Sequence, residues 1–242
     1  MCTVTFMPTT SGCIITSSRD EKAVRTKAIP PRIYSDAATV LVYPKDAEAN
    51  GTWIAMNQNG NAAVLLNGAF VKHEPVYPYR KSRGLVFLDI IKATDPVDYF
   101  SEMNLYNIEP FTIIILQDAE LFECRWDGDS KHYNKLDKNQ PKIWSSATLY
   151  PKEIVVKRQQ WFKQWLHKNP APSQQDIFSF HRFAGEGDEQ NDILMNRNNN
   201  MLTVSITGIE IGIGKSVMRY FDTADNSTSS QELLFEKLPA LS

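Results

Sequence analysis

The order in which strand-like and helix-like segments follow one another constrains the fold of this chain most. Strand patterns come first, at residues 2–7, 13–17, 40–43, 52–56 and 62–66. Helical patterns follow at 82–93 and 95–103, then a strand pair at 111–116 and 121–126, a helix at 151–167, and a hairpin at 201–211 and 217–221. Because strands and helices come in separate blocks, the order favours a layered α+β fold over a doubly wound parallel sheet.

Local signals set the borders of these segments. Pro30-Pro31 predicts an extended connection, and Asp95-Pro96 predicts a helix cap followed by the first helical residue. The helix at 151–167 has one apolar face, built from Ile154, Trp161, Phe162, Trp165 and Leu166. Residues 185–200 are polar and rich in asparagine, which predicts a mobile loop, and we expect a polar tail after about residue 223.

Composition narrows the function classes. The 242 residues carry 26 basic and 28 acidic side chains, a net charge of −2, so no basic field exists to attract nucleic acid. The length suits one large domain or two small ones, and we expect a single domain over residues 1–242. No apolar run approaches the ~20 residues of a membrane span, and the N-terminus has no secretory signal. Three cysteines without a CxxC pair argue against a disulfide framework or a zinc site. We therefore expect a cytoplasmic protein.

Cys2 directly follows the initiator methionine. A small second residue permits removal of Met1, which would leave a cysteine carrying both a thiol and a free α-amine. Their unperturbed pKa values, about 8.5 and about 7.7–8.0, allow the two groups to exchange a proton near neutral pH. One residue would then supply both nucleophile and base. The alternative is that a cysteine stands at this position by chance.

Two later segments carry polar groups that suit such a nucleophile. In residues 17–21, Arg19 is placed to hold a thiolate and lower its pKa, and Asp20 to orient the ammonium group. At the end of the strand at 62–66, the Asn67 side chain and the Gly68 backbone are candidate donors to an oxyanion. The alternatives are a charged turn in the first case and a β-bulge with a turn in the second.

Taken together, these motifs resemble a known family. Met-Cys-Thr-Val at residues 1–4, Ser-Arg-Asp-Glu at 18–21, Gly-Thr-Trp-Ile-Ala at 51–55 and Leu-Leu-Asn-Gly at 65–68 are similar to the NRDE family, also called the transport and Golgi organisation protein 2 family. The strong match covers residues 1–68, with weaker echoes near 144–149 and 197–203. The family is similar to the choloylglycine hydrolase and penicillin V acylase branch of the N-terminal-nucleophile hydrolases, which implies a four-layer αββα sandwich.

The resemblance implies roles for five residues of this chain. Cys2 would be the nucleophile, Arg19 its thiolate partner, Asp20 the residue that holds the amine, Asn67 an oxyanion donor, and Arg197 the late arginine of the acylases. Glu21 remains an alternative to Asp20. The sequence departs from the pattern at Ser146, where the acylases have a second asparagine, and at Ser18, which replaces the asparagine of the family motif.

The resemblance leaves the activity open between two main functions. One is a hydrolase of a non-peptide amide C–N bond in a small-molecule substrate, which requires no cofactor. The other is a non-catalytic protein that binds haem or an acyl lipid in the same cleft, and a third possibility is a vestigial site. The chain's four histidines are haem-ligand candidates only in a general sense: His73, His132, His167 and His181. His167 ends a predicted helix, where a capping role suits a cation better.

The segment 208–216 looks superficially like a phosphate-binding loop. Five residues separate Gly208 from Gly214, whereas the phosphate-binding loop has four and opens a helix. Because the segment joins two predicted strands, we expect a hairpin there and no nucleotide site.

Overall fold

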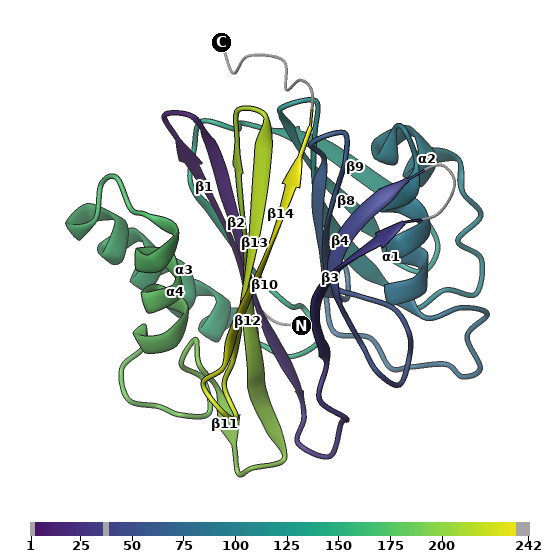
Figure 1. Ribbon diagram of the computed structural model, residues 1–242. Coiled ribbons are helices and arrows are strands. Elements are labelled where there is room, and N and C mark those ends of the chain that lie inside the picture. Colours follow the sequence, from purple (N-terminus) through teal and green to yellow (C-terminus); the bar gives the residue numbers. More distant parts are fainter. Residues whose placement is uncertain (1–2, 36–38, 236–242) are drawn as a thin grey trace.

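The structure is a computed structural model that describes residues 3–35 and 39–235. Figure 1 shows two β-sheets face to face, with one pair of helices on each outer side, so the described chain has four layers in the order α, β, β, α. The first sheet contains β1 (Thr3–Thr9), β2 (Gly12–Lys22), β10 (Lys142–Ser145), β11 (Asn196–Arg197), β12 (Met201–Gly212), β13 (Lys215–Asp222) and β14 (Thr228–Leu234). The second contains β3 (Ile29–Ser35), β4 (Val40–Lys45), β5 (Ile54–Asn57), β6 (Ala62–Asn67), β7 (Phe111–Gln117), β8 (Glu120–Trp126) and β9 (Lys131–Leu136).

The two sheets differ in topology. The second sheet is a meander in which each strand pairs with its neighbours in sequence, in the order β3-β4-β5-β6-β7-β8-β9. The first sheet has the order β10-β1-β2-β12-β13-β14, with β11 paired to β12. Most of its strands therefore come from the two ends of the described chain, with β10 from the middle, and β12 pairs with β2 antiparallel. This pairing places the Ser18–Glu21 end of β2 in the middle of the sheet.

The first sheet has apolar side chains on both faces, which explains why it packs against the second sheet on one side and helices on the other. Val4 and Phe6 of β1 and Ile15 of β2 are buried in the core between the sheets, against residues such as Ile54 of the second sheet. Met7 and Ile14 point the other way, into the cluster beneath the helices of the first sheet. Successive residues of a strand face opposite sides, so both faces of this sheet are covered.

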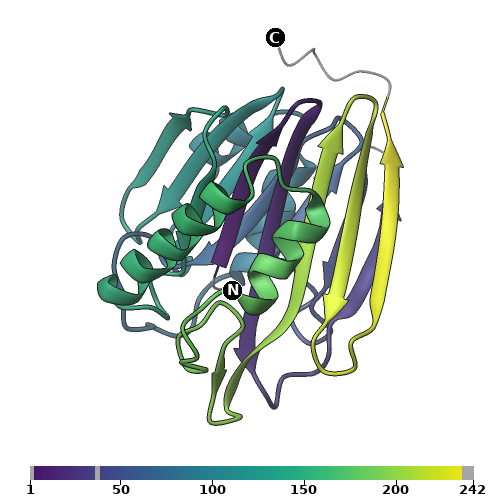
Figure 2. The ribbon, with the colours of Figure 1, turned by 90° about the vertical axis from the view of Figure 1, so that its left-hand side faces the viewer.

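Each outer face carries one helix pair. The second sheet is covered by α1 (Arg83–Lys92) and α2 (Pro96–Glu102), and the first by α3 (Lys152–Lys168) and α4 (Gln174–Phe183), which Figure 2 shows in front of their sheet. As predicted, Asp95 caps α2, with its side chain accepting a hydrogen bond from the Asp98 amide. The α4 cap is a box in which the Ser173 and Asp176 side chains each accept from the other residue's backbone.

Several segments differ from the expectations drawn from the sequence. Residues 29–35 form edge strand β3, because an edge strand tolerates the missing amide hydrogens of Pro30 and Pro31, and a register shift accommodates them. The expected polar tail after about residue 223 is wrong as far as Leu234, since β14 continues the sheet there. Helix α4 and strands β9 to β11 were not expected. The predicted loop at 185–200 is anchored by Ile193 and Met195, which are 0% and 2% exposed.

The hairpin expected at 208–216 is confirmed: β12 and β13 pair antiparallel up to Gly212 and Lys215, and Gly214 adopts a positive φ of 74° in the turn.

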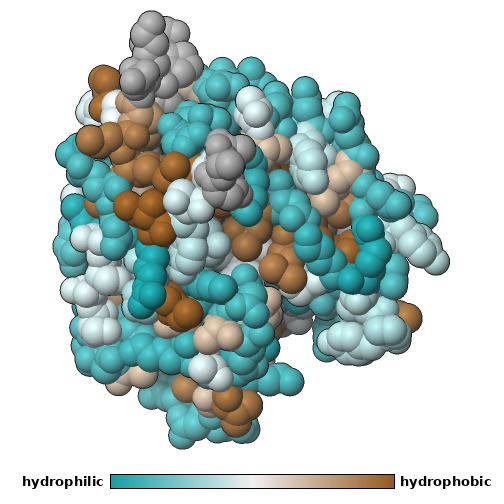
Figure 3. Space-filling model, turned by 45° about the vertical axis from the view of Figure 1, so that its right-hand side comes forward, coloured by the Kyte–Doolittle hydropathy of each residue, from teal (hydrophilic) through white to brown (hydrophobic). Residues whose placement is uncertain are grey.

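Among the described residues, no helix has both the length and the hydropathy needed to cross a bilayer. Figure 3 shows one face on which hydrophilic residues dominate and apolar ones form separate patches.

Candidate active site

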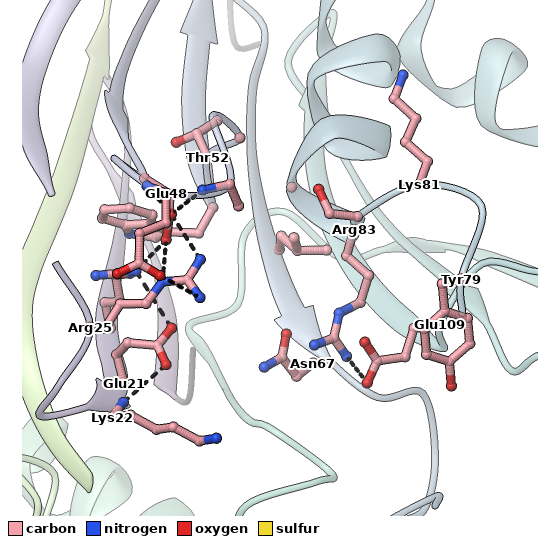
Figure 4. A pocket seen from close by; sticks show the side chains of 18 of the residues that line it. Glu21, Lys22, Arg25, Glu48, Thr52, Asn67, Tyr79, Lys81, Arg83 and Glu109 are labelled. Atoms are coloured by element: carbon pink, nitrogen blue, oxygen red, sulfur yellow. Dashed lines mark hydrogen bonds and ion pairs between the residues drawn. The ribbon is translucent and has the colours of Figure 1, made fainter. Parts of the chain in front are cut away.

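A cleft of about 780 Å³ opens at the end of the space between the two sheets. The first sheet contributes Arg19, Glu21 and Lys22 from the end of β2. The other lining residues, among them Asp46, Glu48 and Trp53, come from the second sheet, the loops beside it and the start of α1. Of these, Asn67, Tyr79, Arg83 and Glu109 form the facing wall. Figure 4 shows Glu21, Arg25 and Glu48 on one side, and Asn67, Arg83 and Glu109 on the other. The cleft therefore brings together Arg19 and Asn67, which stand 48 positions apart in the sequence.

Arg19 bridges the two sheets at the cleft. Its Nη2 lies 2.6 Å from Asp46 Oδ2 and 3.5 Å from Glu21 Oε2. The guanidinium carbon stands 4.6 Å from the centroid of the Trp53 ring, a cation–π distance. With only 4% of its side chain exposed, Arg19 is a fixed positive charge on the cleft wall.

The carboxylate of Asp46 holds two arginines at once. Arg25 Nη2 lies 2.8 Å from Asp46 Oδ1, and the backbone amides of Glu48 and Ala49 donate to the same oxygen. Burial alone would raise the pKa of the Asp46 carboxyl, but the hydrogen bonds from Arg25 and Ala49 and the two arginine charges lower it overall. Asp46 is thus ionised at neutral pH and fixes Arg19 in place.

The facing wall carries a second ion pair. Arg83 Nη1 lies 3.1 Å from Glu109 Oε1, and His73 Nε2 lies 3.2 Å from the same oxygen. Burial lowers the pKa of the Arg83 guanidinium, against the opposing charge of Glu109. Both walls of the cleft therefore combine cations with carboxylates. Such a lining can bind polar groups of a ligand.

Asn67 ends β6, and its neighbours fix its position. The Ser146 hydroxyl donates to the Asn67 carbonyl at 2.9 Å. Ser146 is 0% exposed, so its proton supports Asn67 and is not offered to the cleft. The expectation that the Gly68 amide donates to an oxyanion is wrong here, because that amide already donates to the Pro110 carbonyl at 3.0 Å. Gly68 has a φ of 78°, and a Cβ there would lie 2.9 Å from Thr148 Cγ2.

Asp20 and Glu21 face different surroundings. The Asp20 carboxylate accepts hydrogen bonds from the Tyr150 and Thr203 hydroxyls, and it does not line the cleft. Glu21 lines the cleft beside Arg19. The alternation of β2 produces this difference. Glu21 therefore contacts Arg19 in the cleft, whereas Asp20 contacts Tyr150 outside it.

Arg197 lies in a different neighbourhood from Arg19 and Asn67. Its guanidinium donates to the carbonyls of Gln190 and Leu149, and it stands 5.3 Å from the centroid of the Tyr150 ring. The Tyr150 hydroxyl in turn donates to Asp20. The structure thus links Arg197 to Asp20 through Tyr150, and it does not place Arg197 in the cleft.

Arg158 is a charged residue that the sequence reading overlooked. It is fully buried on α3, where it donates to Thr3 Oγ1 and to the carbonyls of Asn191 and Asp192. Its guanidinium carbon lies 3.7 Å from the Tyr150 ring centroid. Within residues 3–35 and 39–235, no carboxylate forms an ion pair with it. Arg158 therefore places a buried positive charge against Thr3, the first described residue of β1.

Ser18 and His181 tie β1, β2 and α4 together. His181 is 0% exposed, and its Nδ1 and Nε2 lie 2.8 Å and 2.9 Å from the hydroxyl oxygens of Ser18 and Thr5. Burial, with a smaller contribution from Arg158, lowers the pKa of His181 to about 3. The imidazole is thus neutral, and Ser18 supports the scaffold behind Arg19.

The remaining predicted groups are less informative about the site. Cys2, the expected nucleophile, lies outside the described residues. His73 and His132 bond to Glu109 and Asp127, and His167 lies in the last turn of α3. No group of three or more His, Cys, Asp or Glu side chains in the described chain is arranged to hold a metal ion.

Comparison with known proteins identifies the family and the fold of this chain. Residues 1–226 match the family described as Transport and Golgi organisation 2. No curated protein matches the chain in sequence. Among solved structures, a cysteine-to-alanine mutant of the conjugated bile acid hydrolase of Clostridium perfringens aligns with a TM-score of 0.62 and 10% identity, covering 96% of this chain and 92% of its own. The Caenorhabditis elegans orthologue of N-acylethanolamine-hydrolyzing acid amidase aligns with a TM-score of 0.60 and 14% identity, covering 94% and 99%. At these identities the likeness shows the fold, and it confirms the predicted N-terminal-nucleophile sandwich.

Proposed function

The chain belongs to the Transport and Golgi organisation 2 family, and from this premise we propose that it is a cysteine amidohydrolase whose nucleophile is Cys2. The observation that carries the proposal is the meeting of Arg19 and Asn67 in one cleft between the sheets. Cys2 directly precedes Thr3, and Thr3 pairs with Ser18, the residue before Arg19. The fold neighbours, a conjugated bile acid hydrolase and an acid amidase, support the same reaction class.

In the proposed mechanism, removal of Met1 frees the α-amine of Cys2, which accepts the proton of the Cys2 thiol. The thiolate attacks the carbonyl carbon of the substrate amide, and the carbonyl electrons move onto oxygen. The Asn67 side-chain amide donates a hydrogen bond to that oxyanion. Arg19, held by Asp46, stabilises the thiolate and thereby lowers its pKa.

Collapse of the tetrahedral intermediate breaks the C–N bond, and the ammonium group of Cys2 gives its proton to the departing amine. Water then attacks the thioester, with the α-amine as base, and releases a carboxylic acid and the free thiol. Asp20, which accepts from Tyr150 and Thr203, would orient the ammonium group by its charge. The alternative for that role is Glu21, which shares the cleft with Arg19.

Selective alkylation of the native protein tests the proposal. We expect an intact mass that lacks Met1, and at pH 7 we expect iodoacetamide to modify Cys2 alone. Cys13 and Cys124 are 5% and 0% exposed, and burial raises both thiol pKa values to about 12. Arg19→Gln should slow the alkylation of Cys2 about 10-fold, since it removes a neighbouring cation. Arg32→Gln, on the exposed surface of β3, is the matched control. Retained Met1 together with an unreactive Cys2 would rule out the mechanism.

A second function, binding of an acyl lipid or haem without catalysis, is favoured by a separate groove. The groove measures about 930 Å³ and has apolar walls that include Phe70, Val71 and Trp144. Its lining carries four cations and no acidic side chain: Lys72, Arg125, Lys152 and Arg197. Phe70 and Val71 remain 55% and 73% exposed. Arg125 is balanced by Glu123, whose Oε2 lies 2.9 Å from its Nη2, and the three other cations beside apolar walls suit an amphiphile with an anionic group.

Titration of the Cys2→Ala variant separates this carrier function from hydrolysis. If the protein is a carrier, laurate and haem should bind saturably, and Val71→Asp should weaken binding about 10-fold, because it adds a negative charge to the groove. Ile33→Asp, at an exposed apolar position on β3, is the control. Calorimetry for laurate and a Soret shift for haem provide the readouts. Absence of saturable binding of either ligand would exclude the carrier function.

A further inference from the structure

A pocket of about 360 Å³ lies between α4 and the outer face of β13 and β14, apart from the cleft between the sheets. Helix α4 contributes four residues that share one helical face: Gln174, Gln175, Phe178 and Arg182. The sheet contributes Arg219, Tyr220, Phe221 and residues 228–230. None of these residues takes part in the mechanism proposed above, so the pocket is separate from the proposed active site.

Two arginines give the pocket its charge. Arg182 is half-buried, with its guanidinium carbon 4.5 Å from the Phe221 ring centroid, and no ion pair is formed by it in the described part of the chain. Arg219 donates to Gln174 Oε1 and has Glu210 Oε2 at 3.3 Å. The Arg219 guanidinium is therefore balanced by a carboxylate, whereas the Arg182 guanidinium stands over an aromatic ring and has no carboxylate partner among the described residues.

The floor of the pocket is apolar, and a buried polar atom beside it has no hydrogen-bond partner among the described residues. Phe178 and Phe221, each 8% exposed, pack with the fully buried Ile206. Gln174 Nε2, on a residue that lines the pocket, is buried without a hydrogen-bond partner among the described residues, whereas Ser229 pairs with Tyr220 and faces the core between the sheets. An unsatisfied buried donor costs free energy that a bound acceptor would recover.

We propose that this pocket binds a small organic carboxylate with a flat apolar body. Arg182 would hold the carboxylate, since a guanidinium donates two parallel hydrogen bonds to such a group. The flat body would lie against Phe178 beside Arg182, which stands over Phe221, and Gln174 Nε2 would gain an acceptor. The proposal is independent of hydrolysis in the cleft.

Benzoate is the probe, with acetate and inorganic phosphate as comparisons. We expect benzoate to bind saturably at millimolar or lower concentration in calorimetry, and to shift the amide resonances of Ser229 and Ser230 in ¹⁵N spectra. Acetate lacks the ring and should bind more weakly. Arg182→Met should weaken benzoate binding about 10-fold, as expected for the loss of a charge-assisted pair of hydrogen bonds. Arg32→Met, which removes an exposed arginine on β3, should leave it unchanged.

Three results would overturn the proposal: no saturable benzoate binding, equal affinity for phosphate or acetate, or an unchanged affinity in Arg182→Met. The melting temperature of Arg182→Met shows whether a loss of binding reflects unfolding. If that variant is unfolded, Ser230→Asp provides the second test, because it adds a negative charge to the pocket at an exposed position. It should weaken benzoate binding and leave the spectrum elsewhere unchanged.

Discussion

Replacing Cys2 with alanine is expected to lower the rate of amide hydrolysis by at least about 10³-fold, with no change in melting temperature. Loss of a covalent nucleophile typically costs this much or more, because other groups then act only on an uncatalysed attack by water. Alanine is also small, so Met1 would still be removed. The measurement is the release of a fluorescent amine from a panel of N-acyl substrates that differ in acyl length and polarity.

Cys124→Ala is the matched control for this substitution. Cys124 is 0% exposed in the core between the second sheet and its helices, so its loss should cost about 1 kcal/mol of stability and leave hydrolysis intact. Equal hydrolysis by Cys2→Ala and the unaltered protein would contradict the mechanism. If neither Cys2→Ala nor the unaltered protein hydrolyses any substrate of the panel, but Cys2 is alkylated rapidly, the substrate belongs to another chemical class.

Part of the site follows from the sequence because strand geometry is regular. A strand through residues 17–21 alternates its side chains, so Arg19 and Glu21 must share one face and Asp20 must take the other. In the structure the odd-numbered side chains, such as Cys13 and Ile15, face the core between the sheets, whereas Ile14 faces the helices. This reasoning would have placed Glu21, and not Asp20, beside Arg19.

The groups that depend on tertiary contacts could not be predicted in this way. Arg158 looks like any charge on an amphipathic helix, yet it is fully buried because the carbonyls of Asn191 and Asp192 satisfy it. Ser146 resembles a shortened oxyanion donor in sequence, whereas its hydroxyl donates to the Asn67 carbonyl. Helix α4 did leave a signal, since Ser173 and Asp176 have the spacing of a capping box.

His181 makes the scaffold behind Arg19 sensitive to acid. Its two ring nitrogens bond to Thr5 on β1 and Ser18 on β2, so the neutral ring joins the two strands that lead to the proposed site. A protonated ring has two donors and no acceptor, and it would carry a charge in a fully buried position near Arg158. Protonation is therefore unfavourable in the folded state.

The free energy of unfolding is expected to fall as the pH drops from about 6.5 toward 3, with a contribution from His181 of at most ~1.4 kcal/mol per pH unit. The pKa of His181 is lowered to about 3 in the folded protein, whereas an unfolded chain titrates near its usual value of about 6.5. Between these values the unfolded state binds a proton that the folded state does not, so acid favours unfolding, and above pH 6.5 the contribution disappears.

Urea unfolding of the protein and of His181→Gln at pH 7.5, 6, 5 and 4 isolates this contribution. The variant should be less stable at pH 7.5, because it loses well-placed hydrogen bonds, yet its stability should fall less steeply with acid. His167→Gln, at the exposed end of α3, should keep the slope of the unaltered protein. Should His181→Gln fail to fold, ¹⁵N chemical shifts of the imidazole in the unaltered protein provide the same information. A ring that titrates near pH 6.5 while the protein remains folded would show that burial does not hold His181 neutral.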